Sequence, residues 1–329
     1  MPDCNVLITS AGRRVSLVRL FQMALDKLQL NGLVYAVDLQ VHAPALQVAD
    51  KSKTMPQVTD ASYIDQLFEF CKENQIKLVV PTIDKELSIL SKARDQFESR
   101  GIQLLVCSNE VNQVFFDKRS AQRFFEKNKI PTPQLFSIDE AKQLPATQFP
   151  LLLKPNQGSS SIGVTRVNNQ EELLFFLDYL VDPIIQEFVE GDEFTIDVLI
   201  DLNGDVRCAV PRLRVETRAG EVSKAMTVHD SEIIDWAYHI SSELKGALGS
   251  ITIQCMKQKN GKLKFIEVNP RFGGGFPLSA EAGADFPRWI LQMILGAELD
   301  ENLQNKWQDG CVMLRYDEGL FTSRQDIKF

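Results

Sequence analysis

Two apolar-rich segments on either side of Asn260-Gly261 constrain this chain most, because they predict a hairpin whose register can be counted. Residues 251–256 read ITIQCM, and residues 263–269 read LKFIEVN. Asn-Gly between alternating apolar segments favours a two-residue hairpin turn, in which both central residues have positive φ. The sequence therefore predicts two adjacent antiparallel strands in a sheet.

The register of this hairpin predicts a cluster of oxygen-bearing side chains. If Lys259 pairs with Lys262, Gln254 lies directly opposite Glu267. Strand side chains alternate, so Glu267 and Asn269 share one face with Gln254, within about 5–8 Å. Such donors suit Mg²⁺, which also takes phosphate oxygens as ligands. A polar strand face turned to solvent is an alternative that the spacing leaves open.

The first third of the chain alternates short apolar segments with amphipathic helical patterns. One helical pattern places Val18, Phe21, Leu25 and Leu28 on a single face. Strands that are apolar on both faces and alternate with helices predict a parallel, doubly wound α/β sheet. The predicted strands are Asn5–Thr9, Leu33–Val37, Leu78–Pro81 and Gln103–Val106.

The pattern becomes mostly extended beyond the Pro131/Pro133 pair, which breaks regular structure and predicts a boundary. Leu151–Lys154 and Val164–Val167 are predicted strands, and a helix follows them. Helices predicted at Ile233–Leu248 and near Pro287–Leu295 cover the later sheet. The later predicted strands are residues 194–200, 206–210, 250–256 and 262–268.

Composition narrows the classes of function. Lys plus Arg total 36 against 44 Asp plus Glu, for a net charge of −8. A general nucleic-acid binder needs a basic face, so no nucleic-acid partner is expected. Hydrophobic residues at 44% and charged residues at 24% are typical of a globular chain. A length of 329 residues predicts two or three domains.

Cysteine usage and hydropathy predict the compartment. The six cysteines are scattered and never form C-x-x-C, which favours reduced thiols over disulfides or a zinc site. The longest apolar stretch, Leu144–Leu153, contains two prolines and is too short to span a bilayer. We therefore expect a cytoplasmic protein that has no secretory signal and does not associate with a membrane.

The segment KPNQGSSSIGV, which starts at Lys154, has the composition of a phosphate-binding loop. Gly158 and Gly163 permit close backbone approach, and the amides and hydroxyls between them are potential phosphate ligands. Lys154 would add a positive charge. The segment lacks the G-K-[ST] of a Walker A loop, and it joins two predicted strands. A mobile hairpin tip is the alternative interpretation.

Two acidic features are interpreted as structural when each is taken alone. Glu193 and Asp197 fall on one strand face after the apolar segment IIQEFV, and the acidic residues 190–193 read as a surface turn. Asp84 and Glu86 start a predicted helix, where acids interact favourably with the helix dipole.

Taken in order, these motifs resemble the ATP-grasp superfamily, and most closely the carbamoyl-phosphate synthase large subunit. The amino-terminal ITSAGRR and the PTIDKEL segment are similar to that family's pre-ATP-grasp domain. The resemblance covers nearly the whole chain. The ordered set is Asp117-Lys118, Lys154 with its glycine loop, Gln186 to Glu193, and Gln254, Glu267 and Asn269 before Pro270-Arg271.

The resemblance implies a mixed α/β and α+β architecture. A Rossmann-like pre-ATP-grasp domain would occupy residues 1–115. A two-subdomain ATP-grasp fold would follow, with the small lid subdomain at residues 116–190 and the large subdomain, which carries the metal site, at residues 191–329.

The resemblance also implies ATP and Mg²⁺ as cofactors, with Mn²⁺ as an alternative ion. Phosphate contacts are implied for Lys118, Lys154, Gly158, Ser159, Ser160, Ser161 and Gly163. Adenine and ribose contacts are implied for Gln186, Glu187, Phe188, Val189 and Glu193. The implied metal ligands are Gln254, Glu267 and Asn269.

Arginines are the candidates for holding a negatively charged substrate. Arg271 would reach phosphate or substrate and act with Lys154 in catalysis, although a core ion pair is its alternative role. Arg212 and Arg214 lie on one strand face and suit capture of a carboxylate, bicarbonate or phosphate. A solvated basic strand, balanced by Glu216 and Glu221, is the alternative for that pair.

The reaction implied is phosphorylation of a small-molecule carboxylate to an acylphosphate, with ADP as product, followed by attack of an amine or ammonia. One alternative is a split or single-module carbamoyl-phosphate synthase acting on bicarbonate, and another is a non-catalytic ATP-binding module. A homodimer is compatible with each of these. No Ser-His-Asp or Cys-His arrangement predicts a covalent protein intermediate.

Overall fold

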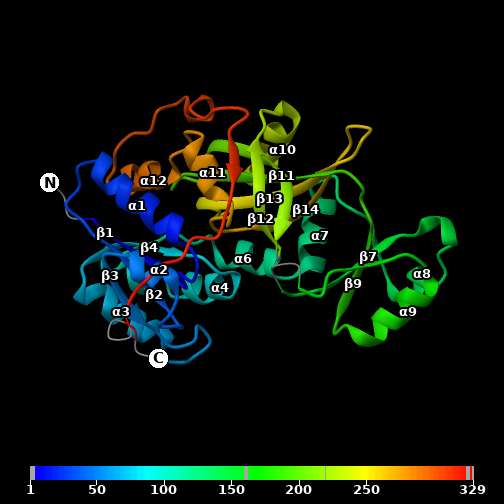
Figure 1. The fold of residues 1–329 in the computed structure, drawn as a ribbon, viewed down its shortest axis with the longest axis horizontal. Helices are drawn as coiled ribbons and strands as arrows, with labels where there is room; N and C mark the ends of the chain where they lie inside the picture. Colours follow the sequence, from blue (N-terminus) through cyan, green and yellow to red (C-terminus); the bar gives the residue numbers. More distant parts are fainter. Residues whose placement is uncertain (1–3, 159–161, 219, 324–326, 328–329) are drawn as a thin grey trace.

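The computed structural model describes residues 4–158, 162–218, 220–323 and 327. The predicted loop residues Ser159, Ser160 and Ser161 lie outside these ranges. Three sheets follow one another along the chain (Figure 1). Within the described ranges, no helix is long and apolar enough to cross a membrane. All six cysteines are free thiols.

The first sheet is parallel, five-stranded and ordered β3-β2-β1-β4-β5, which confirms the predicted doubly wound sheet. Sequence analysis missed β3, because its KSKT side chains are all exposed and carry no apolar pattern. The elements are β1 (Asn5–Thr9), α1 (Val15–Lys27), β2 (Val34–Asp38), α2 (Pro44–Val48), β3 (Lys51–Thr54), α3 (Tyr63–Glu73), β4 (Ile76–Pro81), α4 (Asp84–Lys92), α5 (Arg94–Glu98), β5 (Gln103–Leu104) and α6 (Asn109–Phe116).

The carboxyl ends of β1 and β4 form the switch point of this sheet. The two strands are neighbours, with Thr9 paired to Pro81. Thr82 Oγ1 donates a hydrogen bond of 2.7 Å to the Ser10 carbonyl. The loops that start here lead to α1 and α4, so residues of both loops lie at the edge where open α/β sheets bind ligands.

The second sheet is four-stranded, has the order β6-β9-β7-β8 and forms a lid that projects to one side (Figure 1). Its core is separate and contains Leu151, Leu153, Val167, Leu173 and Ile185. The lid therefore has a hydrophobic core of its own, separate from the main core. The elements are β6 (Leu135–Phe136), α8 (Ile138–Ala141), η1 (Ala146–Gln148), β7 (Leu151–Pro155), β8 (Thr165–Val167), α9 (Gln170–Tyr179) and β9 (Pro183–Glu187).

Helix α7 (Lys118–Lys127) precedes the lid but packs elsewhere. Its buried residues Ala121 and Phe125 belong to the main core, and the helix contacts β14 of the third sheet. Asp117 is its N-cap and accepts a 2.8 Å hydrogen bond from the Ser120 amide. The domain boundary at residue 116 remains a prediction.

The third sheet is antiparallel, six-stranded and ordered β14-β13-β10-β11-β12-β15. The predicted helix at residues 233–248 is shorter, because α10 ends at Ser242. The elements are β10 (Asp192–Ile200), β11 (Val206–Arg218), β12 (Glu221–Thr227), α10 (Ser231–Ser242), β13 (Gly249–Lys257), β14 (Leu263–Asn269), α11 (Phe276–Glu281), α12 (Phe286–Ile294), η2 (Leu303–Asn305) and β15 (Val312–Leu314).

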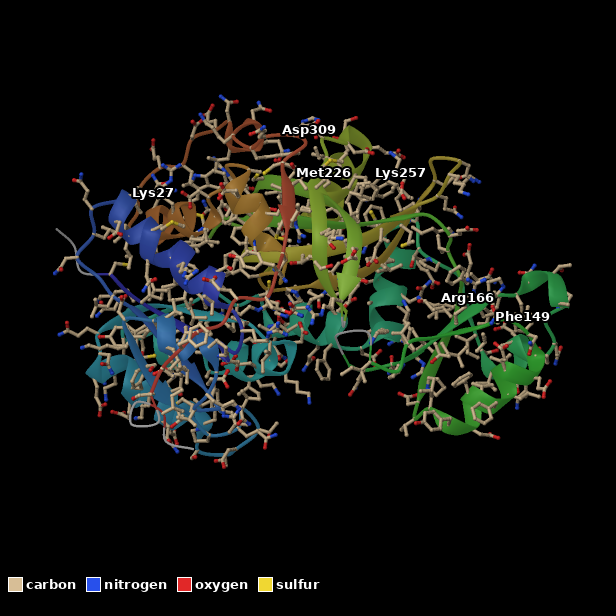
Figure 2. All side chains as sticks on the ribbon, viewed as in Figure 1. Lys27, Phe149, Arg166, Met226, Lys257 and Asp309 are labelled. Carbon is tan, nitrogen blue, oxygen red and sulfur yellow. The ribbon has the colours of Figure 1, made fainter. Side chains whose placement is uncertain are left out.

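The amino-terminal domain and the third sheet share one core. Phe21 of α1 meets Phe272 edge to face, with ring centroids 6.1 Å apart. Lys27, at the end of α1, forms a 2.8 Å ion pair with Asp285, just before α12 (Figure 2). Edge-to-face rings of this kind add about 0.5–1.5 kcal/mol beyond the burial of area. These two parts are therefore packed as one body.

The β13–β14 pairing confirms the central prediction of the sequence. Gln254 lies opposite Glu267, and Thr252 lies opposite Asn269. Side chains alternate along both strands, so all four share one face of the sheet.

The turn that joins the two strands differs from the prediction. The Gln258 amide donates a 2.9 Å hydrogen bond to the Lys262 carbonyl, so the loop has three residues instead of two. Of the Asn-Gly pair only Gly261 has positive φ, at +85°. A bulge between Gln254 and Cys255 shifts the register by one residue. The two irregularities compensate, and the predicted pairing of Gln254 survives although the predicted turn was wrong.

Candidate active site

One cavity of about 560 Å³ lies where the amino-terminal domain, the lid and the third sheet meet. Of the predicted site residues that the structure describes, all except Gly163 line it, and their roles remain predictions. The predicted residues in its wall are Lys118, Lys154, Gly158, Gln186, Glu187, Phe188, Val189, Glu193, Arg212, Arg214, Gln254, Glu267, Asn269 and Arg271.

The floor of the cavity is a polar row that crosses four strands of the third sheet. Glu267 lies opposite Gln254, Gln254 opposite Thr195, and Thr195 opposite Arg212. Alternation turns the next residues to the other face, where Ile196 and its neighbours join the main core. The row is therefore fixed by strand register and backed by a packed apolar layer.

A second polar row lies behind the first and supplies the carboxylate that pairs with the buried Arg212. Asn269, Thr252 and Asp197 are successive cross-strand neighbours. Asp197 binds the Arg212 guanidinium at two points, with Nε 2.7 Å from Oδ2 and Nη2 3.1 Å from Oδ1. Ser279 Oγ donates a further 2.6 Å hydrogen bond to Asp197. Arg212 is 1% exposed, so the alternative of a solvated basic strand is wrong for this residue.

Arg214 and Glu193 form an ion pair with each other. Arg214 Nη1 lies 2.5 Å from Glu193 Oε1, and its Nη2 donates a 3.1 Å hydrogen bond to the Gly220 carbonyl. The implied ribose contact of Glu193 would therefore use Oε2 of a carboxylate that Arg214 orients. A substrate contact by Arg214 would require this pair to open.

Two lysines face Glu267 across the cavity. Burial lowers the pKa of Lys154, and the nearby Glu267 carboxylate offsets part of that shift. Burial also lowers the pKa of Lys118, again opposed chiefly by Glu267. Lys118 Nζ donates to the Gly158 carbonyl at 3.1 Å. The structure thus gathers two cations and one carboxylate around a space large enough for phosphate groups.

Asn156, which the sequence analysis did not single out, joins the glycine loop to the start of α7. Its Nδ2 donates a 2.7 Å hydrogen bond to Asp117 Oδ2, and its Oδ1 accepts one of 3.2 Å from the Arg119 amide. The Asn156 amide donates to the Asp182 carbonyl at 3.0 Å. These contacts hold the start of the loop that follows Lys154.

The segment Gln186–Val189, the implied adenine hinge, connects the lid to the third sheet. Glu187 Oε2 accepts hydrogen bonds from the Gln134 amide at 3.1 Å and from Lys264 Nζ at 3.2 Å. Arg166 lies on the lid (Figure 2). Its guanidinium carbon is 4.6 Å from the centroid of the Phe188 ring. Side chains of both bodies therefore fix the hinge.

Three polar residues are among the contributors to the cavity wall that sequence reasoning missed. Thr195 and Thr252 belong to the polar rows, and Arg14 reaches the cavity from the loop after β1. Arg14 belongs to the ITSAGRR segment, whose similarity to a pre-ATP-grasp domain is a signal for the domain and not for this side chain.

The predicted metal ligands fit a magnesium ion that is also coordinated by the phosphate oxygens of a nucleotide. Gln254, Glu267 and Asn269 share one sheet face and line the cavity beside Lys154. They supply oxygen donors but a single carboxylate. Among the described residues, no group of three His, Cys, Asp or Glu is placed to hold a metal ion. Such a set suits Mg²⁺, which is completed by phosphate oxygens and waters.

Comparisons with known proteins agree with this geometry. Residues 6–105 match the model described as PylC-like, N-terminal domain, and residues 180–316 match ATP-grasp in the biosynthetic pathway with Ter operon. D-alanine–D-alanine ligase A of Bacillus cereus is 20% identical over 281 residues, covering 71% of this chain and 91% of that protein. Carbamoyl-phosphate synthase of Methanobrevibacter smithii is 23% identical over 248 residues, covering 70% of this chain and 67% of that protein.

The fold has a solved counterpart. The biotin carboxylase domain of Hydrogenobacter thermophilus 2-oxoglutarate carboxylase, in complex with MgADP and bicarbonate, superposes with a TM-score of 0.73 at 18% identity. The match covers 93% of this chain and 73% of that one. It confirms the predicted architecture, a parallel α/β domain followed by the two antiparallel sheets of an ATP-grasp fold.

Proposed function

We propose that this chain, whose residues 6–105 match a PylC-like N-terminal domain and whose residues 180–316 match an ATP-grasp family, is an ADP-forming carboxylate–amine ligase of the ATP-grasp superfamily. It would use ATP and Mg²⁺ to phosphorylate a small carboxylate, and an amine would then attack the acylphosphate. The observation that carries the proposal is the gathering of Lys118, Lys154 and the Gln254–Glu267 pair in one cavity.

The lysines provide the charge that phosphoryl transfer needs. Lys154 and Lys118 would hold phosphate oxygens, and their lowered pKa values reflect burial that a bound polyanion would compensate. Gln254, Glu267 and Asn269 would hold the magnesium ion. When bound, that ion would neutralise charge on the β- and γ-phosphates.

The proposed chemistry has two steps. A carboxylate oxygen of the acceptor attacks the γ-phosphorus as the bond to the β-phosphate oxygen breaks, which gives an acylphosphate and ADP. The amine nitrogen then attacks the acyl carbon, the carbon–oxygen bond to phosphate breaks, and the nitrogen loses a proton. Arg271 donates through Nε and Nη2 to Asp84 and through Nη1 to the Phe272 carbonyl, which leaves one Nη1 hydrogen for a ligand. It lies beside Asn269, and with that hydrogen it is our candidate to orient the acceptor carboxylate.

Bicarbonate is the second candidate acceptor. Gln254 is a proposed metal ligand at a position where many ATP-grasp ligases have an acid, and this favours the synthase-like branch. One relative is a carbamoyl-phosphate synthase. A non-catalytic ATP-binding module is the third reading. The complete set of two lysines and three oxygen donors argues against it.

Nucleotide product analysis separates these readings. Purified protein is incubated with Mg·ATP and single carboxylates, with bicarbonate as a separate arm, and ammonia or an amino acid as nucleophile. ADP release stimulated by an organic acid supports the ligase. Bicarbonate-stimulated ADP release supports the synthase. ADP release that no acceptor stimulates, or no turnover at all, contradicts the proposal.

A further inference from the structure

The amino-terminal domain supplies one arginine that the proposed phosphoryl transfer does not use. Arg14 follows β1, immediately precedes α1, and lines the cavity. Its backbone is fixed, because its carbonyl accepts hydrogen bonds from the Leu17 and Val18 amides at 3.0 and 3.1 Å. Within the described ranges its guanidinium makes no hydrogen bond or ion pair. The side chain is thus held at the cavity without a partner.

The charged side chains around Arg14 do not balance its positive charge. Its charged neighbours are Arg271, Arg315, Asp84 and Glu221, so three cations face two anions. Arg271 is bound to Asp84 at 2.7 Å, and Arg315 lies 3.3 Å from Glu221. Burial, and then Arg271, lower the pKa of Arg14 to about 10, which still leaves it protonated at neutral pH. A bound anion would relieve this excess of positive charge.

A second unpaired donor lies against the glycine turn at residues 273–275, which also lines the cavity. Arg212 donates hydrogen bonds to Asp197 through Nε and Nη2. Its buried Nη1 has no hydrogen-bond partner among the described residues. A Cβ on Gly274 would lie 2.9 Å from Arg14 Nη1, and a Cβ on Gly275 would collide with Arg212 Nη1. Glu221 Oε1 would lie 3.1 Å from the same Cβ on Gly274, so a carboxylate also borders this turn. The two guanidinium ends therefore approach adjacent residues of the turn, and Gly275 leaves no room for a side chain beside the buried Arg212.

Arg14 and its charged neighbours lie at the position where parallel α/β sheets usually bind ligands. Arg14 follows β1 and Asp84 begins α4, so both come from the switch point between β1 and β4. Ligands of open α/β sheets bind outside the carboxyl ends of the strands at that point. α1 also contacts α11 and α12, which brings this edge against the glycine turn (Figure 1).

We propose that Arg14, together with the free Nη1 of Arg212, binds a second anionic group of the acceptor. The acceptor would then be a dianion, with one carboxylate that receives the phosphoryl group and a further carboxylate or phosphate held at the glycine turn. The planar fork of Arg14 suits either group. This inference rests on the proposed function and narrows its substrate class.

Calorimetry with matched four-carbon-length probes tests the inference. Succinate, 3-phosphonopropionate and butyrate are titrated into the protein with and without Mg·ADP, so that the anion preference is measured even if the nucleotide fails to bind. We expect at least one dianion to bind about tenfold or more tightly than butyrate, which is a difference of about 1.4 kcal/mol. The tighter dianion identifies the second group as carboxylate or phosphate.

Variants assign that preference to Arg14. Arg14→Gln should remove it, while Arg13→Gln, a change at the exposed neighbouring arginine, should keep it. Arg14→Lys keeps the charge but loses the fork, and should reduce the preference about threefold or more even if the glutamine variant does not fold.

Equal binding of all three probes by the wild-type protein, binding of none, or a preference that persists in a folded Arg14→Gln protein would overturn the inference. Failure of the proposed function would instead appear as loss of Mg·ADP binding with the anion preference intact.

Discussion

The guanidinium of Arg271 and the carboxylate of Asp84 form a two-point ion pair between the end of the third sheet and the first residue of α4. Nε lies 2.8 Å from Oδ1, and Nη2 lies 2.7 Å from Oδ2. Arg271 Nη2 also donates a 3.2 Å hydrogen bond to Asn269 Oδ1. The amino-terminal domain therefore orients an arginine that lies directly beside the proposed metal site.

Asp84→Asn should weaken acceptor use without weakening nucleotide binding. The amide keeps the shape but loses the charge that holds Arg271, so KM for the acceptor that drives ADP release should rise about tenfold. Mg·ADP affinity, measured by calorimetry, should stay within about twofold. Glu98→Gln is the control, because that residue pairs with Arg94 at the surface, away from the cavity. An unchanged acceptor KM in Asp84→Asn would show that the ion pair has no role in positioning.

Glu267→Gln should abolish ATP turnover while the protein stays folded. Glu267 is the single carboxylate among the proposed metal ligands and lies outside the apolar core. We expect the rate to fall about 100-fold or more and the Mg²⁺ concentration for half-maximal rate to rise. Glu190→Gln, at an exposed acid on the cavity rim, is the control. Normal turnover by Glu267→Gln at limiting Mg²⁺ would remove Glu267 from the metal site.

Lys154→Met should weaken Mg·ATP binding and slow phosphoryl transfer, because one positive charge is lost with little change in volume. Lys118→Met should act in the same direction but less severely. Lys142→Met, on the exposed surface of the lid, should change neither quantity. Calorimetry and single-turnover rates check all three variants. Unchanged affinity together with an unchanged rate in Lys154→Met would return this residue to a structural role.

Glu86→Gln should flatten the pH dependence of stability. Glu86 is fully buried, accepts a hydrogen bond from the Tyr63 hydroxyl, and has a pKa raised chiefly by burial. A raised carboxyl pKa stabilises the fold at low pH, and this contribution is lost as the pH rises through the folded-state pKa. Above the usual glutamate range, the free energy of unfolding should therefore fall by up to about 1.4 kcal/mol per pH unit in the wild-type protein.

Urea unfolding at a series of pH values compares the two proteins. The glutamine keeps an acceptor for Tyr63 but cannot ionise, so the free energies of unfolding of variant and wild type should diverge as the pH rises. Superimposable pH profiles would show that Glu86 is not a buried titrating group.

The part of the polar cavity floor on β13 and β14 could be predicted, because the alternation of strand side chains and the Asn-Gly turn both pointed to the same hairpin. Alternation placed Glu267 and Asn269 on one face, and Asn-Gly located the hairpin. The bulge beside Gln254 could not be predicted, because its extra residue, Ile266 of β14, continues the strand pattern of its neighbours, and β13 pairs with β10 without interruption. It happened to cancel the one-residue error in the predicted turn.

Contacts between distant elements could not be predicted. The Arg212–Asp197 pair requires the β10–β11 register, in which Asp197 lies opposite Val210 and diagonal to Arg212. Asp84 was interpreted as an acid at a helix start, which is correct for α4, but its pairing with Arg271 depends on domain packing. Arg14 was missed for the same reason, since nothing local to ITSAGRR places it at the cavity.

Analysis of the nucleotide and acyl products by ³¹P NMR, with hydroxylamine as the trapping nucleophile, tests the central claim most directly. Hydroxylamine attacks an acylphosphate and leaves a hydroxamate, so every turnover should yield ADP, phosphate and one hydroxamate of the acceptor acid. We predict equal amounts of ADP and hydroxamate in the wild-type protein, and neither product in Glu267→Gln. AMP and pyrophosphate as products, or carboxylate-stimulated ADP release that yields no trapped acyl group, would contradict the account.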